Sequence, residues 1–162
     1  MTNIISIILL VTLTLVAAVW DLVKKKIPNE IVFPGILAGL LLAMADRVLW
    51  GRIAGLAILF LFAYLVYKKF HHQIGLGDIK LWMMCEAFTG FEASLYIFTF
   101  SQVLLFLFAL IGGKGKEMKN GLRNYLVYGT LLPGTKQYPF APFFFISTVL
   151  YGLVMVLKGI PV

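Results

Sequence analysis

Residues 75–91, GLGDIKLWMMCEAFTGF, decide how many times this chain crosses a membrane. Asp78 stands on a glycine-flanked break, and the segment that follows it, residues 79–91, is short and carries Lys80 and Glu86. On hydropathy alone this segment is a doubtful span. Whether it crosses fixes the side of the membrane on which every later loop lies.

The composition of the chain indicates an integral membrane protein. Of its 162 residues, 61% are hydrophobic, 15% are aromatic and only 13% are charged, whereas about 25% of the residues of a soluble domain are charged. A membrane-spanning helix needs about 20 apolar residues, so about five to seven helices fill the chain. We therefore predict an all-α membrane protein in which residues 1–162 form a single integral-membrane domain.

Five further apolar segments accompany the doubtful one. Residues 3–20 are nearly unbroken and no Lys or Arg precedes them, so we expect a retained helix rather than a signal peptide. The others are residues 31–45, 53–67, 93–111 and 140–157. Together with residues 79–91, they predict a bundle of six transmembrane helices with a short, glycine-broken fourth helix.

The distribution of Lys and Arg favours six crossings. With six, eleven basic residues fall on one side and three on the other. The eleven are Lys24, Lys25, Lys26, Lys68, Lys69, Lys80, Lys114, Lys116, Lys119, Arg123 and Lys136, and the three are Arg47, Arg52 and Lys158. If the fourth segment did not cross, the basic residues from 114 to 136 would change sides and the bias would largely vanish.

This bias also predicts orientation. Lys and Arg concentrate in short cytoplasmic loops, so we expect a multi-pass protein of the inner, or cytoplasmic, membrane with both termini outside. The net charge of +7 is explained by this orientation, since basic loops meet anionic lipid headgroups. Membrane lipid is an expected partner, and nucleic acid is not.

Asp21 and Asp78 fall on the same, cytoplasmic side in this topology. Asp21 closes the first segment, and Asp78 opens the fourth. Ionisable residues at membrane depth normally face a bundle interior or a water-filled cavity. Two carboxylates in one cavity can share a proton, so that one activates a water while the other polarises a scissile carbonyl. This pattern predicts that Asp21 and Asp78 are the catalytic pair of an aspartic endopeptidase.

Gly75 and Gly77 give the backbone before Asp78 a freedom that a Cβ would remove. We expect them to present Asp78 outside a regular helix and to leave backbone groups open to an extended substrate. The plainer interpretation is a turn followed by a helix N-cap, with Asp78 accepting backbone hydrogen bonds. Taken alone, the motif supports both interpretations equally.

Further landmarks make the pattern more specific. They are Trp20-Asp21 ending the first segment, Ile27-Pro28-Asn29 opening the second, Gly75-Leu76-Gly77-Asp78-Ile79-Lys80 opening the fourth and Pro139-Phe140-Ala141-Pro142 opening the sixth. In this order the chain resembles the prepilin peptidase family, which are membrane aspartyl proteases with a Gly-x-Gly-Asp motif. The resemblance implies that Asp21 and Asp78 are catalytic. It also implies motif-supporting or substrate-binding roles for Gly75, Gly77, Lys80, Pro28, Asn29, Pro139 and Pro142.

The resemblance further implies the substrate and the form of the enzyme. The substrate is a type IV pilin-like precursor, whose short basic leader is cut at the cytoplasmic face next to its hydrophobic helix. Long family members carry an extra cytoplasmic region, often with paired cysteines, that is associated with N-methylation of the new amino terminus. Here residues 21–30 alone join the first two segments, and Cys85 is the single cysteine. The chain is thus similar to the short, peptidase-only members that serve tight-adherence pili, and to the core of archaeal preflagellin peptidases.

No cofactor is expected from these features. Without the extra region, the resemblance implies that the chain has no methyltransferase domain and needs no S-adenosylmethionine. A lone cysteine excludes a paired-cysteine zinc site, and no metal is expected.

Several residues remain open to two interpretations. Lys80 could stabilise a nearby anion or extend to the lipid headgroups. Glu86 lies near the helical face of Asp78, where it lines the cavity or, more simply, is a buried, hydrogen-bonded structural acid. Pro139 and Pro142 are expected to shape the start of the sixth helix, and residues 114–138 are a candidate substrate-contacting loop.

Two other functions compete with the peptidase. A small transporter or channel subunit could use Asp21 and Asp78 as a proton or cation site, but the chain has no inverted repeat and its two acids lie at segment ends. An intramembrane protease of the presenilin type pairs its motif with a Tyr-Asp acid, whereas Trp20 precedes Asp21 here.

Overall fold

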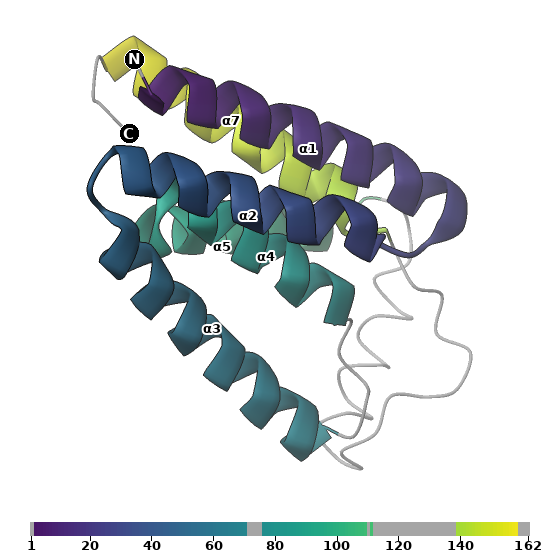
Figure 1. Cartoon of the computed structure of the whole chain (residues 1–162). Coiled ribbons are helices and arrows are strands. Elements are labelled where there is room, and N and C mark those ends of the chain that lie inside the picture. The colour runs from purple at the N-terminus through teal and green to yellow at the C-terminus, as the bar shows by residue number, and fades with distance from the viewer. Residues whose placement is uncertain (1, 71–75, 110, 112–138, 159–162) are drawn as a thin grey trace.

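The computed structural model describes residues 2–70, 76–109, 111 and 139–158. Within these ranges the chain is helical, and the helices pack side by side (Figure 1). They are α1 (Thr2–Lys24), α2 (Asn29–Ala45), α3 (Leu49–Phe70), α4 (Leu76–Thr89), α5 (Phe91–Ala109) and α7 (Ala141–Lys158). Each predicted apolar segment has become one of these six helices, so the all-helical prediction is confirmed.

Length and composition separate the helices into groups. In α1 and α5 the apolar stretches, Ile4–Lys24 and Phe91–Phe108, are long enough to cross a membrane. Shorter apolar stretches lie in α2, α3 and α7. With 14 residues, α4 is only about 21 Å long at 1.5 Å per residue. Six crossings therefore stay a prediction.

Several predicted segment ends differ from the observed helices, as in α3, which runs over Leu49–Phe70 instead of 53–67, and two of the differences concern the acids. The first helix does not stop at Trp20 but continues through Asp21 to Lys24, which places Asp21 inside its last turn. The fourth helix begins at Leu76, so Gly77 and Asp78 belong to its first turn. Asp78 is therefore neither the N-cap nor outside a regular helix, because the backbone at Gly77 is already helical. Gly75 and the 114–138 loop lie outside the described residues.

Helix α4 occupies the centre of the bundle. It packs against α1, α2, α3 and α5, and every residue from Leu81 to Thr89 except Met83 is buried. Because α4 is surrounded by other helices, residues 79–91 can have a low hydropathy and still form a helix inside the bundle. A helix enclosed by protein can carry polar side chains that a lipid-facing helix cannot.

Small residues on α2 allow its close approach to α4. The buried positions of α2 are Val32, Gly35, Gly39 and Ala43, which repeat every three or four residues along one helical face. A Cβ added to Gly39 would lie 2.8 Å from the backbone carbonyl carbon of Ala87 in α4. Small residues at such spacing let the backbones of membrane helices pack closely.

The last helix returns beside the first. Helices α1 and α7 pack along each other (Figure 1), and a Cβ on Gly152 would lie 2.9 Å from the Ile7 side chain. Because the two helices run in opposite directions, the end of α1 meets the start of α7. Asp21 and Ala141 are thereby brought together, although they are far apart in sequence.

Helix α3 is attached to the bundle mainly through its first half. Gly55 and Leu59 are buried, whereas Phe60 and Leu65 are exposed. The helix diverges from α4 toward its C-terminal end (Figure 1).

Substituting Gly39 with Ala is expected to destabilise the protein by about 1 to 3 kcal/mol, the usual cost of overpacking a core. The new Cβ would press on the Ala87 backbone, which cannot move without displacing α4. Gly51→Ala is the matched control, because no heavy atom lies within 4 Å of a Cβ at Gly51. Thermal melting in detergent should show a lower melting temperature for Gly39→Ala alone. Equal melting temperatures for the two variants would contradict this packing.

Candidate functional site

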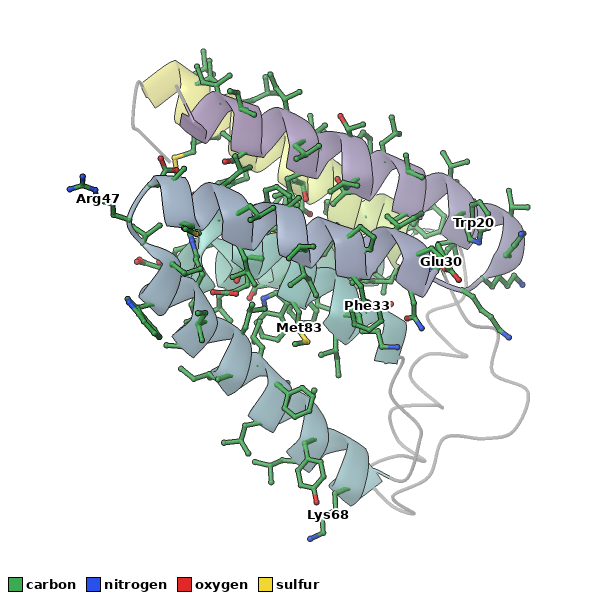
Figure 2. All side chains as sticks on the ribbon, viewed as in Figure 1. Trp20, Glu30, Phe33, Arg47, Lys68 and Met83 are labelled. Carbon is green, nitrogen blue, oxygen red and sulfur yellow. The ribbon has the colours of Figure 1, made fainter. Side chains whose placement is uncertain are left out.

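A pocket of about 700 Å³ opens where α1 ends and where α2, α4 and α7 begin. Most of the residues predicted for the site line it: Asp21, Pro28, Asn29, Gly77, Asp78, Lys80 and Pro139. Trp20, Ile27, Glu30 and Phe140 line it too, together with Lys24, Lys25 and Lys26. Figure 2 shows Trp20 and Glu30 at this end of the bundle and Arg47 at the other.

Asp21 is fixed at the pocket by a backbone donor. The residue is only 6% exposed, and its Oδ2 accepts a hydrogen bond of 3.0 Å from the backbone N–H of Ala141. Ala141 is the first residue of α7, so the carboxylate satisfies one of the donors that a helix leaves unpaired at its N-terminus. Four residues after Asp21, Lys25 takes a left-handed φ of 51°, which ends α1 and turns the chain toward α2.

An aromatic row holds the start of α7 in place. Trp82 of α4 stacks on Phe98 of α5 with ring centroids 4.2 Å apart. Phe98 in turn meets Phe140 edge-on at 5.7 Å. The indole N–H of Trp82 donates to the Ser94 hydroxyl at 3.2 Å. Phe140 is buried and directly precedes Ala141. These contacts therefore hold in place the Ala141 N–H that donates to Asp21.

Asp78 faces the same pocket from the first turn of α4. It precedes the apolar segment 79–91 and is partly buried. Burial, and then the negative charge of Asp21, raise the pKa of Asp78 to about 7. The two acids are therefore close enough to interact, and near neutral pH Asp78 can hold a proton.

Lys80 and Asn29 join α4 to α2 at the rim of the pocket. The Lys80 ammonium donates to the Asn29 side-chain oxygen at 3.0 Å. Pro28 is the N-cap of α2, with φ −74° and ψ 138°, and its carbonyl accepts from the N–H of Ile31 at 3.3 Å. In this arrangement Lys80 positions the start of α2 and lies within the pocket.

The glycine and proline predictions have different outcomes. At Gly77 a Cβ would lie 3.5 Å from Ile27, which is ordinary contact, so the fold itself does not require glycine there. Pro139 lines the pocket. Pro142 does not line it and is instead the second residue of α7, consistent with its predicted part in starting that helix.

Glu86 lies away from the pocket and lacks the predicted hydrogen bond. Its side chain is fully buried, and among the described residues neither carboxylate oxygen has a hydrogen-bond partner. The carboxylate lies against Gly55 of α3, where a Cβ would collide with it. Arg52 is the charged group that acts on it. Glu86 is thus a buried acid at the contact between α3 and α4, away from the pocket.

The pocket offers acid–base chemistry. One buried carboxylate with a fixed donor and one that can hold a proton suit the activation of water. In the part of the chain that the structure describes, no group of three or more His, Cys, Asp or Glu residues is arranged to hold a metal ion.

Comparison with known proteins identifies the family. A sequence model of the type IV leader peptidase family matches residues 8–110. The chain belongs to the type IV leader peptidase family. Searches of curated proteins and of solved structures found no significant match. The predicted resemblance is confirmed at this level, and membership implies a protease that acts on type IV pilin-like precursors.

The matched residues of this leader peptidase include Asp21 and Asp78 but end before Ala141. Sequence reasoning assigned Pro139 and Pro142 a part in starting the last helix and missed the backbone N–H between them. The pattern Pro139-Phe140-Ala141-Pro142 was the feature of the sequence that could have indicated this N–H. A helix that begins there presents an unpaired N–H next to a proline that has none.

Neutralising one member of the Arg52–Glu86 pair is expected to destabilise the leader peptidase more than neutralising both. Removing Arg52 leaves the fully buried Glu86 without its basic neighbour, and removing Glu86 leaves the partly buried Arg52 without its acidic one. Arg52→Gln, Glu86→Gln and the double variant should give a coupling free energy of about 1 kcal/mol or more in thermal melts. Glu92→Gln is the control, since Glu92 is exposed. Additive effects of the two single substitutions would show that the charges do not support each other.

Proposed function

We propose that this leader peptidase is a multi-pass membrane aspartic endopeptidase that removes the basic leader from a type IV pilin-like precursor at the cytoplasmic membrane face. One observation carries the proposal. Asp21 and Asp78, from separate helices, face one pocket and interact electrostatically there. Paired carboxylates of this kind can divide the base and acid roles of peptide hydrolysis.

The surface of the bundle supports a place within the membrane. Large apolar side chains are exposed on α1, α2, α3, α5 and α7, including Ile8 at 61%, Leu41 at 61%, Phe60 at 65%, Phe106 at 51% and Leu153 at 54%. Soluble monomers rarely expose apolar patches this extensive. Lipid would cover these side chains on every outer helix.

The charges at the two ends of the bundle support the orientation. Lys24, Lys25, Lys26 and Lys80 lie around the pocket, and Arg47 lies at the opposite end (Figure 2). The rule that basic residues remain inside puts the pocket at the cytoplasmic face, with both termini outside. A membrane-embedded precursor would present its leader junction at this level.

The short connection between α1 and α2 supports a peptidase-only enzyme. Only residues 25–28 separate the two helices, and Ile27 and Pro28 line the pocket. This connection leaves no space for an inserted methyltransferase region. We propose that residues 1–162 act as one peptidase domain that needs no S-adenosylmethionine.

Asp21→Asn and Asp78→Asn should each reduce precursor cleavage by about 100-fold or more, the usual contribution of a general acid or base. An amide cannot take a proton from water or return one to the leaving nitrogen. The measurement is the size of a co-expressed pilin precursor, with mass spectrometry of the mature amino terminus. Asp46→Asn is the matched control, because Asp46 follows α2 and does not line the pocket. Persistent cleavage by both Asp21→Asn and Asp78→Asn would refute the proposal.

Gly77→Ala should fold normally and cleave about tenfold more slowly or worse, since small misplacements of substrate have large effects on rate. The fold has room for the Cβ beside Ile27, whereas a substrate backbone in the pocket would meet it. The variant should match Gly51→Ala in yield and melting temperature but not in cleavage rate. Equal cleavage rates would show that the substrate does not approach Gly77.

A further inference from the structure

We propose that Glu30 is a specificity-determining residue, whose side chain at the pocket binds a Lys or Arg side chain in the leader of the precursor. This inference deepens the proposed function and rests on it for the position of the leader. Glu30 acts on the affinity for the precursor and takes no part in the chemical step.

The leader of such a precursor is positively charged for a general physical reason. A precursor that is anchored by a membrane helix and cut at the cytoplasmic face carries its leader on the cytoplasmic flank of that helix. Lys and Arg accumulate on such flanks. The pocket therefore has to accept cationic side chains close to the bond that is cut.

Glu30 is the acid that remains for this task once Asp21 and Asp78 are assigned to the chemistry. Among the acids that the structure describes, these three line the pocket. The described acids that do not line it are Asp46, Glu86 and Glu92. A cation of the leader can thus bind Glu30 without occupying either member of the proposed catalytic pair.

The position of Glu30 is fixed by the start of α2. Glu30 is exposed in the first turn of that helix, at the same end of the bundle as Trp20 (Figure 2). It directly follows Asn29, whose side-chain oxygen accepts a hydrogen bond of 3.0 Å from the Lys80 ammonium of α4. Glu30 therefore stands on a helix that is tied to the element carrying Asp78, and it is open to a substrate side chain.

The basic residues around the pocket restrict where a cationic leader can lie. Lys24, Lys25 and Lys26 follow one another at the end of α1 and line the pocket, and they repel a leader of the same sign. Glu30 on the α2 side offsets this repulsion.

The pocket lining already accommodates an ammonium group. The Lys24 ammonium lies 4.0 Å from the centre of the Trp20 ring, and Trp20 lines the pocket together with Glu30. An aromatic face and a carboxylate are the two kinds of group that attract Lys and Arg side chains. This combination is the chemistry expected of a subsite for a basic side chain.

Equilibrium binding of a fluorescently labelled pilin precursor to the full chain, in a zwitterionic detergent, tests the inference. Two precursors are compared that differ only in the leader, where one carries lysines and the other carries glutamates. Every chain in this measurement also carries Asp78→Asn, so that bound precursor is not cut.

Glu30→Gln should weaken binding of the lysine precursor by about threefold to fivefold, the contribution of an exposed ion pair. Glu30→Lys should weaken it by about tenfold or more, because it places like charges together. The same Glu30→Lys chain should bind the glutamate precursor more tightly than the chain that retains Glu30 does.

Glu92→Lys is the matched control for Glu30→Lys. Glu92 is also an exposed acid in the first turn of a helix, α5, and it does not line the pocket. Both substitutions change the net charge by the same amount, and both should leave the melting temperature unchanged. Glu92→Lys should also leave the affinities for the two precursors unchanged.

Cleavage by the chain that retains Asp78 provides a kinetic readout. Glu30→Lys should raise KM for the lysine precursor by about tenfold and leave kcat unchanged, since a contact made equally in the ground state and the transition state affects binding alone. A lower kcat at an unchanged KM would place Glu30 in the chemical step and overturn the assigned role.

Two binding results would overturn the inference. Either Glu30→Lys and Glu92→Lys bind the lysine precursor equally, or the glutamate precursor gains no affinity from Glu30→Lys. Neither result depends on cleavage. Failure of the unsubstituted chain to process any precursor would therefore count against the proposed function, whereas binding decides the role of Glu30.

Discussion

The close approach of α2 to α4 is the constraint on which the rest of the structure depends. Gly39 faces the Ala87 backbone with no space for a Cβ, so α4 can sit directly against α2. Helices α1, α3 and α5 then pack on the remaining sides of α4. Because α4 is enclosed, it can carry acids at both ends of the bundle, Asp78 at the pocket and Glu86 at the far end. Neither side chain has to face the outer surface.

The acids near the two ends of α4 have different surroundings. At the far end, Glu86 is fully enclosed between α3 and α4, and Arg52 supplies the charge that acts on it. At the pocket end, Asp78 is only partly buried and its strongest charged neighbour is another acid. A fully buried acid beside a basic side chain, away from the pocket, suits a structural role. Burial and then the charge of Asp21 raise the pKa of Asp78 beside the pocket, which suits acid–base chemistry.

Much of this arrangement could be predicted from the sequence, because hydropathy and charge are carried by side chains. The apolar segments gave the helices, and the bias of Lys and Arg placed Asp21 and Asp78 at one end. The predictions that are wrong concern backbone conformation and packing. The motif around Gly77 predicts a break in the helix, but a glycine in a first turn is compatible with a helix as well as with a break. Gly39 and Ala141 went unnoticed, since close packing and a free N–H depend on which helices become neighbours.

The part of the chain that matches the family supplies both acids, whereas the donor to Asp21 comes from α7, beyond the matched residues. The surroundings of Asp21 are therefore completed by a helix whose start depends on aromatic packing across α4 and α5. The buried Ala141 N–H already donates to Asp21 in the free protein, so this contact is in place before substrate binds. Such preorganised polarity reduces the reorganisation needed during the reaction.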